Sequence, residues 1–346
     1  MTVQRYVLTP QMRQYDDFDD RAQVRYLPYL MYFHRANYHS EVLNTDRLGF
    51  RISHGVDESA STGGRIPDRP VRLLVGSSIV FGVGATNDHA TLASRLWSRH
   101  APSVPWLNFG GRSYNSLQEV LLLLLHRELL PEIEEIVLLT GFNNLVLTGL
   151  PPRMQGDHGA FFYCGEYLDQ TEELLRRRRE QKKGRAKRSH KTDPPAPTPD
   201  QDSPATTADP ERLIAQAAAW TCRDLDNWCR LAGGARVSFV LQPVATWVRD
   251  RAAPQEQALF DEYDDMARLG AFQDLRGVIT TPEVGRRYAE VLRAACAKRS
   301  MPFVDLNPVL ADATKPDQWL YVDRAHLTDE GSDIVARLLA DRLSLT

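Results

Sequence analysis

Five short runs of apolar residues recur along the chain, and most are followed by a stretch with helical periodicity. The runs cover residues 71–75, 106–109, 136–139, 236–244 and 303–307. Short apolar runs of this kind are typical of strands that are buried on both faces. The helical patterns lie near residues 89–100, 117–130, 210–231, 256–269, 282–298 and 329–343. Strands that alternate with helices predict a parallel sheet covered on both faces. In the second helix, the spacing of Ser116 and Glu119 predicts a capping box.

Two segments do not follow this alternation. Residues 1–69 contain many aromatic residues, as in "YLPYLMYFHRANYH", but little periodicity, and we interpret them as an arm that packs on the main domain, 70–346. A block of basic residues followed by a Pro-, Asp- and Thr-rich tract interrupts that domain at about 176–209. Such a composition cannot bury a core, so we predict a disordered surface insertion. A solvated loop without a dedicated ligand is the simpler interpretation, and binding of an acidic partner is the alternative.

Composition and charge narrow the class of protein only a little. The chain has 346 residues, a net charge of -3 and 42% hydrophobic residues, which match a globular protein and give no support for nucleic-acid binding. The first thirty residues lack the features of a signal peptide, and the longest apolar run, 120–125, is too short to span a bilayer. We therefore expect a cytoplasmic protein without a membrane span. The cysteines form no CxxC pair and no metal-ligand spacing with histidine, so we expect neither metal nor cofactor.

The first apolar run ends in a loop rich in glycine and serine, "VGSSIVFGVG" at 75–84. A Walker-type phosphate loop requires a lysine and Ser/Thr after its last glycine, whereas Val83 follows Gly82. A dinucleotide fingerprint requires a third glycine where Asn87 stands. A nucleophilic serine is the third interpretation, because open α/β sheets bind their ligands at the carboxyl ends of the strands. This last interpretation fits the loop best.

A serine nucleophile needs a base, an orienting acid and donors for an oxyanion. The segment "YVDRAHLTDEG" offers Asp323 and His326, three residues apart, before a helix that we expect to start near Thr328. The segment "TGFNNL" offers the side-chain amide of Asn143, and "NFGGRSYNS" offers backbone amides in a glycine-rich turn. Each pattern is common in isolation, and the evidence lies in their order and in their positions after predicted strands.

These four segments resemble blocks I, II, III and V of the SGNH/GDSL hydrolases, a family of esterases, lipases and acyl-carbohydrate deacetylases. The resemblance covers about 70–150 and 235–345. It implies an α/β fold, a three-layer α/β/α sandwich with a parallel five-stranded sheet of the flavodoxin-like kind. It also implies Ser78 as the nucleophile, His326 as the general base and Asp323 as the acid that orients it.

The resemblance further implies an oxyanion hole made by the side chain of Asn143 and the backbone amides of Ser78 and Ser113. Two positions depart from the family pattern. Ser77 stands where an aspartate is usual, which removes a charge and adds a rival hydroxyl. Ser113 stands where block II has a glycine, but its backbone amide is still available. Neither departure removes a group that does the chemistry.

The activity that this resemblance implies is ester hydrolysis through an acyl-serine intermediate. The expected substrate is a small-molecule ester or an acylated carbohydrate. An O-acyltransferase with the same triad is one alternative, and a catalytically silent binding protein with this fold is another. We favour an enzyme, because a scaffold has no need to keep Ser78, Asn143, Asp323 and His326 together.

Overall fold

The computed structural model describes residues 4–19, 25–27, 29–150, 155–156, 158–162, 209–267 and 277–345. The insertion expected at about 176–209 lies outside these described residues, apart from Asp209 at its end.

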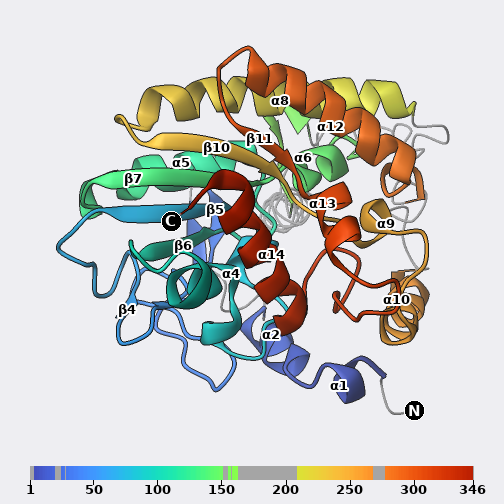
Figure 1. Cartoon of the computed structure of the whole chain (residues 1–346), viewed down its shortest axis with the longest axis horizontal. Helices are drawn as coiled ribbons and strands as arrows, with labels where there is room; N and C mark the ends of the chain where they lie inside the picture. Colours follow the sequence, from blue (N-terminus) through green and yellow to red (C-terminus); the bar gives the residue numbers. More distant parts are fainter. Residues whose placement is uncertain are drawn as a thin grey trace, which may run out of the picture.

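A five-stranded parallel sheet forms the centre of the molecule (Figure 1). Its strands are β5 (Val71–Gly76), β6 (Trp106–Gly110), β7 (Ile133–Thr140), β10 (Arg236–Leu241) and β11 (Phe303–Asp305). They lie in the order β6-β5-β7-β10-β11, which is the flavodoxin-like order of a doubly wound sheet. Every residue of β5 and β6 is buried. The predicted fold class and all five predicted strands are therefore confirmed.

Helices cover the sheet on two sides (Figure 1). Helices α5 (Ser116–His126), α8 (Pro210–Leu231) and α12 (Pro282–Ala297) pack together on one side. Helices α4 (Leu92–Arg95) and α14 (Asp329–Leu343) pack together on the other. Four further helices follow strands, namely α3 (Ser78–Phe81), α6 (Phe142–Leu147), α9 (Ala245–Val248) and α13 (Leu306–Ala313), and α10 (Pro254–Ala267) follows α9. The result is the three-layer α/β/α sandwich that the sequence predicts.

The capping-box prediction for α5 was wrong by one residue. The N-cap is Asn115, whose side chain accepts a hydrogen bond from the amide of Gln118 at 2.9 Å. The side chain of Gln118 in turn accepts one from the amide of Asn115 at 3.1 Å. Asparagine is as good an N-cap as serine. Ser116 and Glu119 are therefore free to bond elsewhere, and both side chains are buried in polar contacts with other elements.

Three other elements differ from their predicted extents. The strand expected at 236–244 ends at Leu241. The helix expected near 89–100 is divided into a 3₁₀ turn (Asp88–Ala90), α4 and a π-helical turn (Leu96–His100). The division occurs at Thr91, whose side chain caps α4 by accepting from the amide of Ser94. The last strand ends at Asp305 rather than at 307, because the Asp305 side chain caps α13 through the amide of Asn307 at 3.0 Å.

The N-terminal residues contain short elements of their own. These are helices α1 (Gln4–Leu8) and α2 (Met12–Phe18) and strands β1 (Arg25–Leu27), β2 (Met31–Phe33), β3 (Ser53–His54) and β4 (Ser59–Ala60). The side chains of Leu30, Phe33 and Phe50 are buried in the same apolar cluster as the central strands. The N-terminal segment thus shares the main core.

Helix α2 contributes to a second apolar cluster, beside the loops that carry the candidate site. Its buried residues, Met12, Tyr15 and Phe18, share that cluster with residues from two distant parts of the chain. Those residues are Phe81 and Val83, which closely follow Ser78, and Val322, which precedes Asp323. Helix α2 therefore packs against residues that closely follow Ser78 and against the residue that precedes Asp323.

Candidate active site

Ser78 is the first residue of the short helix α3, just beyond the end of strand β5. Helix α3 lies close against the end of β6, where Gly110 pairs with Gly76. A side chain at Gly110 would place its Cβ 2.1 Å from the backbone nitrogen of Phe81. Glycine at this position therefore allows α3 to lie on the sheet edge. Ser78 is thus held at the carboxyl end of β5, one of the two strands between which the strand order reverses, and doubly wound sheets bind ligands at such a point.

A continuous chain of hydrogen bonds joins Ser78 to His326 and Asp323. The hydroxyl of Ser78 lies 2.7 Å from Nε2 of His326. The other ring nitrogen, Nδ1, lies 2.7 Å from Oδ2 of Asp323. The second carboxylate oxygen accepts from the backbone amides of Ala325 and His326, both at 2.9 Å. The carboxylate is thereby fixed, and it favours the tautomer in which Nδ1 carries the hydrogen and Nε2 accepts from the serine.

The electrostatic environment keeps Asp323 ionised. Burial acts to raise the pKa of this carboxyl, but attraction to His326 and the hydrogen bonds from its ring and from two backbone amides outweigh that effect. The pKa of Asp323 therefore lies below its ordinary value. An ionised carboxylate beside Nδ1 can stabilise an imidazolium if the ring accepts a proton.

The carbonyl groups at the end of helix α3 receive hydrogen bonds from side chains. Asn108 donates to the carbonyl of Val80 at 2.8 Å. Arg51 donates through Nη1 to the carbonyls of Phe81 at 3.2 Å and Gly82 at 2.8 Å. Carbonyls at a helix end have no partner within the helix and need one elsewhere. These donors hold the end of the helix whose first residue is Ser78.

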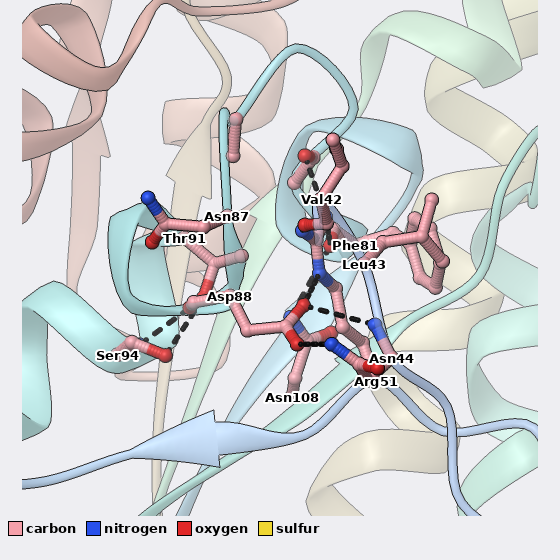
Figure 2. A network of polar contacts seen from close by, with 12 residues as sticks. Val42, Leu43, Asn44, Arg51, Phe81, Asn87, Asp88, Thr91, Ser94 and Asn108 are labelled. Atoms are coloured by element: carbon pink, nitrogen blue, oxygen red, sulfur yellow. Dashed lines mark hydrogen bonds and ion pairs between the residues drawn. The ribbon is translucent and has the colours of Figure 1, made fainter. Parts of the chain in front are cut away.

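Arg51 is itself part of a buried polar network (Figure 2). Its Nε donates to Asp88 at 2.7 Å, and the two side chains are 0% and 5% exposed. Its remaining nitrogen, Nη2, donates to the carbonyl of Val42 at 2.8 Å, and Nη1 also reaches the hydroxyl of Tyr15 at 2.9 Å. The side-chain amide of Asn44 donates to the other oxygen of Asp88 at 2.7 Å. A buried charge of each sign is therefore paired and hydrogen-bonded, as low-dielectric surroundings require.

The loop after β6 leaves one backbone amide open. The amide of Gly111 donates to the carbonyl at the end of β5 at 2.9 Å, and that of Tyr114 donates back to Gly111 at 3.0 Å. The amide of Arg112 donates to Nε2 of His34 at 3.0 Å. Across the described part of the chain, the amide of Ser113 has no acceptor, and this residue has a positive φ of 58°. Among these four amides, only that of Ser113 is left for a ligand.

Asn143 adjoins the same loop from the end of β7. Its side-chain nitrogen donates to the carbonyl of Tyr114 at 2.8 Å. An amide nitrogen carries two hydrogens, so one remains for a ligand. The next residue, Asn144, is buried and accepts from the amide of Ser116 at 3.0 Å, which anchors α6 on α5. The amide of Ser78, as the first of α3, has no acceptor within the helix and is a further donor.

A buried acid, Glu119, lies on α5 against the end of β7. One of its oxygens accepts from the hydroxyl of Thr140 at 2.7 Å, and the other has no partner in the described residues. Burial raises the pKa of Glu119 well above its ordinary value, and nearby Asp224 acts in the same direction, whereas the bond from Thr140 acts against it. Glu119 is thus a carboxyl that burial favours in its neutral form.

The rival serine is placed differently from Ser78. Ser77 is 1% exposed, and its hydroxyl lies 3.4 Å from Oε1 of Gln242. The hydrogen bond to the imidazole is made by Ser78. His34 and Arg51 were missed by the sequence reasoning, because neither lies in a periodic pattern or follows a predicted strand of the sheet.

The described residues contain neither a candidate metal cluster nor a candidate membrane-spanning helix. No cluster of three or more His, Cys, Asp or Glu side chains among them could hold a metal ion. No helix within the described ranges has both the length and the apolarity needed to cross a bilayer.

Comparison with known proteins gives structural likenesses only, since no family model and no curated protein matches the chain. A lipolytic protein of the G-D-S-L family from Veillonella parvula is 12% identical over 80% of this chain and 99% of its own, with a TM-score of 0.42. An extracellular lipase from Streptomyces rimosus is 14% identical over 80% and 100%, with a TM-score of 0.41. An acetyl xylan esterase from Butyrivibrio proteoclasticus is 10% identical over 83% and 67%, with a TM-score of 0.36.

At these identities and TM-scores the likenesses do not identify an activity. The solved structures that the chain is similar to thus include a lipolytic protein of the G-D-S-L family, a lipase/acylhydrolase from Enterococcus faecalis and an extracellular lipase.

Proposed function

We propose that this protein is a serine hydrolase that cleaves a carboxylic ester through an acyl group on Ser78. The observation that supports this most directly is the hydrogen-bonded chain from Ser78 through His326 to Asp323, with both distances at 2.7 Å. These are the distances at which a base can take a proton from a nucleophile and be oriented by an acid.

In the proposed reaction, Oγ of Ser78 attacks the ester carbonyl carbon and its proton passes to Nε2 of His326. The negative oxygen of the tetrahedral intermediate accepts hydrogen bonds from the amides of Ser78 and Ser113 and from the side chain of Asn143. The carbon–oxygen bond to the alcohol then breaks, and His326 returns the proton to the departing oxygen. Water attacks the acyl-serine in the same way, which releases the acid and restores Ser78.

The oxyanion donors supply a large part of the proposed rate enhancement. Loss of one such donor lowers kcat by about 100- to 1000-fold in comparable enzymes. Two of the three donors proposed here are backbone amides, and their direction depends on the conformation of α3 and of the loop after β6. A residue that holds either of these two segments in place should therefore affect kcat.

The proposed substrate class is a small-molecule ester or an acylated carbohydrate. Transfer of the acyl group to an alcohol instead of water would use the same three side chains. No contact within the described residues favours that acceptor over water, so hydrolysis is the proposal. A catalytically silent binding protein is less consistent with the site, because a binding role does not require the serine, the imidazole and the carboxylate to be joined by hydrogen bonds.

Release of p-nitrophenolate from p-nitrophenyl acetate by the full chain tests this proposal. Ser78→Ala should lower kcat by at least about 1000-fold, the scale on which removal of a nucleophile acts. Ser77→Ala is the matched control, and it should retain most of the activity, because the hydroxyl of Ser77 is bonded to Gln242 and the hydrogen bond to the imidazole is made by Ser78.

A p-nitrophenyl phosphonate, followed by mass spectrometry of peptides, should place the covalent label on Ser78. A label on Ser77, or an active Ser78→Ala variant, would contradict the assignment.

A further inference from the structure

We propose that His34 is a positioning residue for the oxyanion hole, which holds the loop of Ser113 and the helix of Ser78 in a fixed relation. This inference rests on the function proposed above, and it assigns a role to the N-terminal segment in that reaction.

The ring of His34 has a hydrogen-bond partner at each nitrogen. The side chain is 2% exposed, and Nε2 lies 3.0 Å from the backbone nitrogen of Arg112. Because a backbone amide can only donate, Nε2 must be the acceptor and carry no hydrogen. Nδ1 lies 3.0 Å from the carbonyl of Gly49 and so carries the hydrogen. His34 is therefore held as one neutral tautomer, and the amide of Arg112 is directed at it.

The bond to Arg112 restricts the peptide that carries the open amide. The amide of Ser113 lies between that of Arg112, which is bonded to His34, and that of Tyr114, which is bonded to Gly111. With both neighbouring amides fixed, the Ser113 peptide has little freedom to rotate. If the bond to His34 were lost, the amides of Gly111 and Tyr114 would still be bonded, but the Ser113 peptide between them would be less restricted and its amide could turn away from the substrate.

The same ring packs against two aromatic residues, one of which belongs to the helix that begins at Ser78. The ring centre of His34 lies 4.1 Å from that of Phe81, the last residue of α3. It also lies 4.5 Å from the ring centre of Phe33, at an angle of 26°. One side chain thus contacts both segments that supply the proposed backbone donors, α3 by packing and the Ser113 loop by a hydrogen bond.

Two further contacts tie this part of the N-terminal segment to the same region. The hydroxyl of Tyr114 donates to the carbonyl of Tyr32 at 2.7 Å, and the side chain of Gln118 donates to the carbonyl of Leu30 at 2.7 Å. Gly49 permits the approach on the far side of His34, since it has a φ of 95° and its Cβ would lie 2.6 Å from the His34 carbonyl. The placement of His34 is therefore fixed from several directions.

The test compares three substitutions of His34 that separate the effects of the two hydrogen bonds made by its ring. His34→Gln can place an acceptor near the position of Nε2, whereas His34→Asn can keep only the donor toward Gly49, and His34→Ala keeps neither. With p-nitrophenyl acetate, His34→Asn and His34→Ala should lower kcat by about 10- to 100-fold with KM nearly unchanged, the effect of misplacing a catalytic donor by about 1 Å. His34→Gln should recover most of that loss.

A second control separates misplacement from general destabilisation of the N-terminal segment. Tyr38→Phe removes hydrogen bonds to Gln14 and Asp17 in that segment and does not touch the Ser113 loop. It should leave kcat unchanged, and melting temperatures of all variants should be measured. Equal kcat for wild type and His34→Asn, or kcat losses in all variants that simply follow the melting temperature, would overturn the role of His34.

The rate at which a p-nitrophenyl phosphonate labels Ser78 provides a readout that does not depend on the natural substrate. It should fall with kcat across the His34 variants and recover in His34→Gln. Rapid labelling of Ser78 in wild type that is unchanged in His34→Ala would refute the positioning role while leaving the proposed function intact. Failure of wild type to label or to turn over ester would refute both.

Discussion

Replacement of Arg51 by methionine should destabilise the protein strongly, because it leaves a buried carboxylate without its counter-charge. Methionine fills much of the same space with no donors. Asp88, at 5% exposure, would keep only neutral donors from Asn44. Removal of one partner of a buried ion pair costs about 3–5 kcal/mol in free energy of unfolding. The carbonyls of Val42 and Phe81 also lose donors, which places the expected cost toward the upper end of that range.

A double-mutant cycle with Asp88→Asn tests whether the pair itself accounts for this cost. The second substitution removes the uncompensated charge. The double variant should therefore lose about 2–3 kcal/mol less free energy of unfolding than the sum of the two single losses. Unfolding in urea, followed by circular dichroism, gives the four free energies. Arg286→Met serves as a control, because that side chain is exposed and its ion pair with Glu283 lies on the surface. It should change stability little.

Two outcomes would refute this reasoning. One is additive losses for Arg51→Met and Asp88→Asn. The other is a loss for Arg51→Met no larger than that for Arg286→Met. Activity of the folded fraction gives an independent check, since Arg51 holds the end of the helix that begins at Ser78. Folded Arg51→Met should show a lower kcat, whereas Arg286→Met should not.

Three further predictions follow from the site. His326→Ala should nearly abolish ester turnover, and addition of Asp323→Asn should change it little more, whereas additive kinetic losses would argue against a catalytic unit. The lowered pKa of Asp323 stabilises the folded state above the unfolded pKa of about 3.9 and is lost as pH falls through the folded value, so the stability advantage over Asp323→Asn should shrink only below about pH 4. The raised pKa of Glu119 has the opposite sign, because the folded protein keeps a proton that the unfolded chain releases above about pH 4.3. Glu119→Gln should therefore gain stability relative to wild type as pH rises, by up to about 1.4 kcal/mol per pH unit, and a constant difference from pH 5 to 8 would contradict this.

The sheet could be predicted from the sequence because its strands are buried on both faces. Such strands are continuous apolar runs, and they stand out from the amphipathic helices between them. The candidate site could be predicted for a related reason. Ser78 and Asn143 directly follow the strands β5 and β7, and a parallel sheet brings the carboxyl ends of its strands to one edge.

Local ambiguity accounts for the smaller errors in the prediction. Asn115 and Ser116 are both good N-caps, and each has a polar residue three positions later that could complete the box. Which residue caps the helix depends on contacts in the interior. There Asp224 accepts a hydrogen bond from the hydroxyl of Ser116, and Thr140 donates one to the carboxyl of Glu119. Both partners lie far away in the sequence, so no local pattern could reveal them.

The contribution of the N-terminal segment could not be predicted, for a different physical reason. Arg51 donates to main-chain carbonyls on α3, and His34 accepts from a main-chain amide on the Ser113 loop. Every residue except proline offers both backbone groups, so the sequence contains no complementary side chain that would identify the partner. The sequence shows that residues 34 and 51 are polar or charged, but it does not show that their side chains are used in the interior. Because the fold buries these two side chains against the segments that carry Ser78 and Ser113, it is His34 and Arg51, and not the whole segment at 30–51, that support the candidate active site.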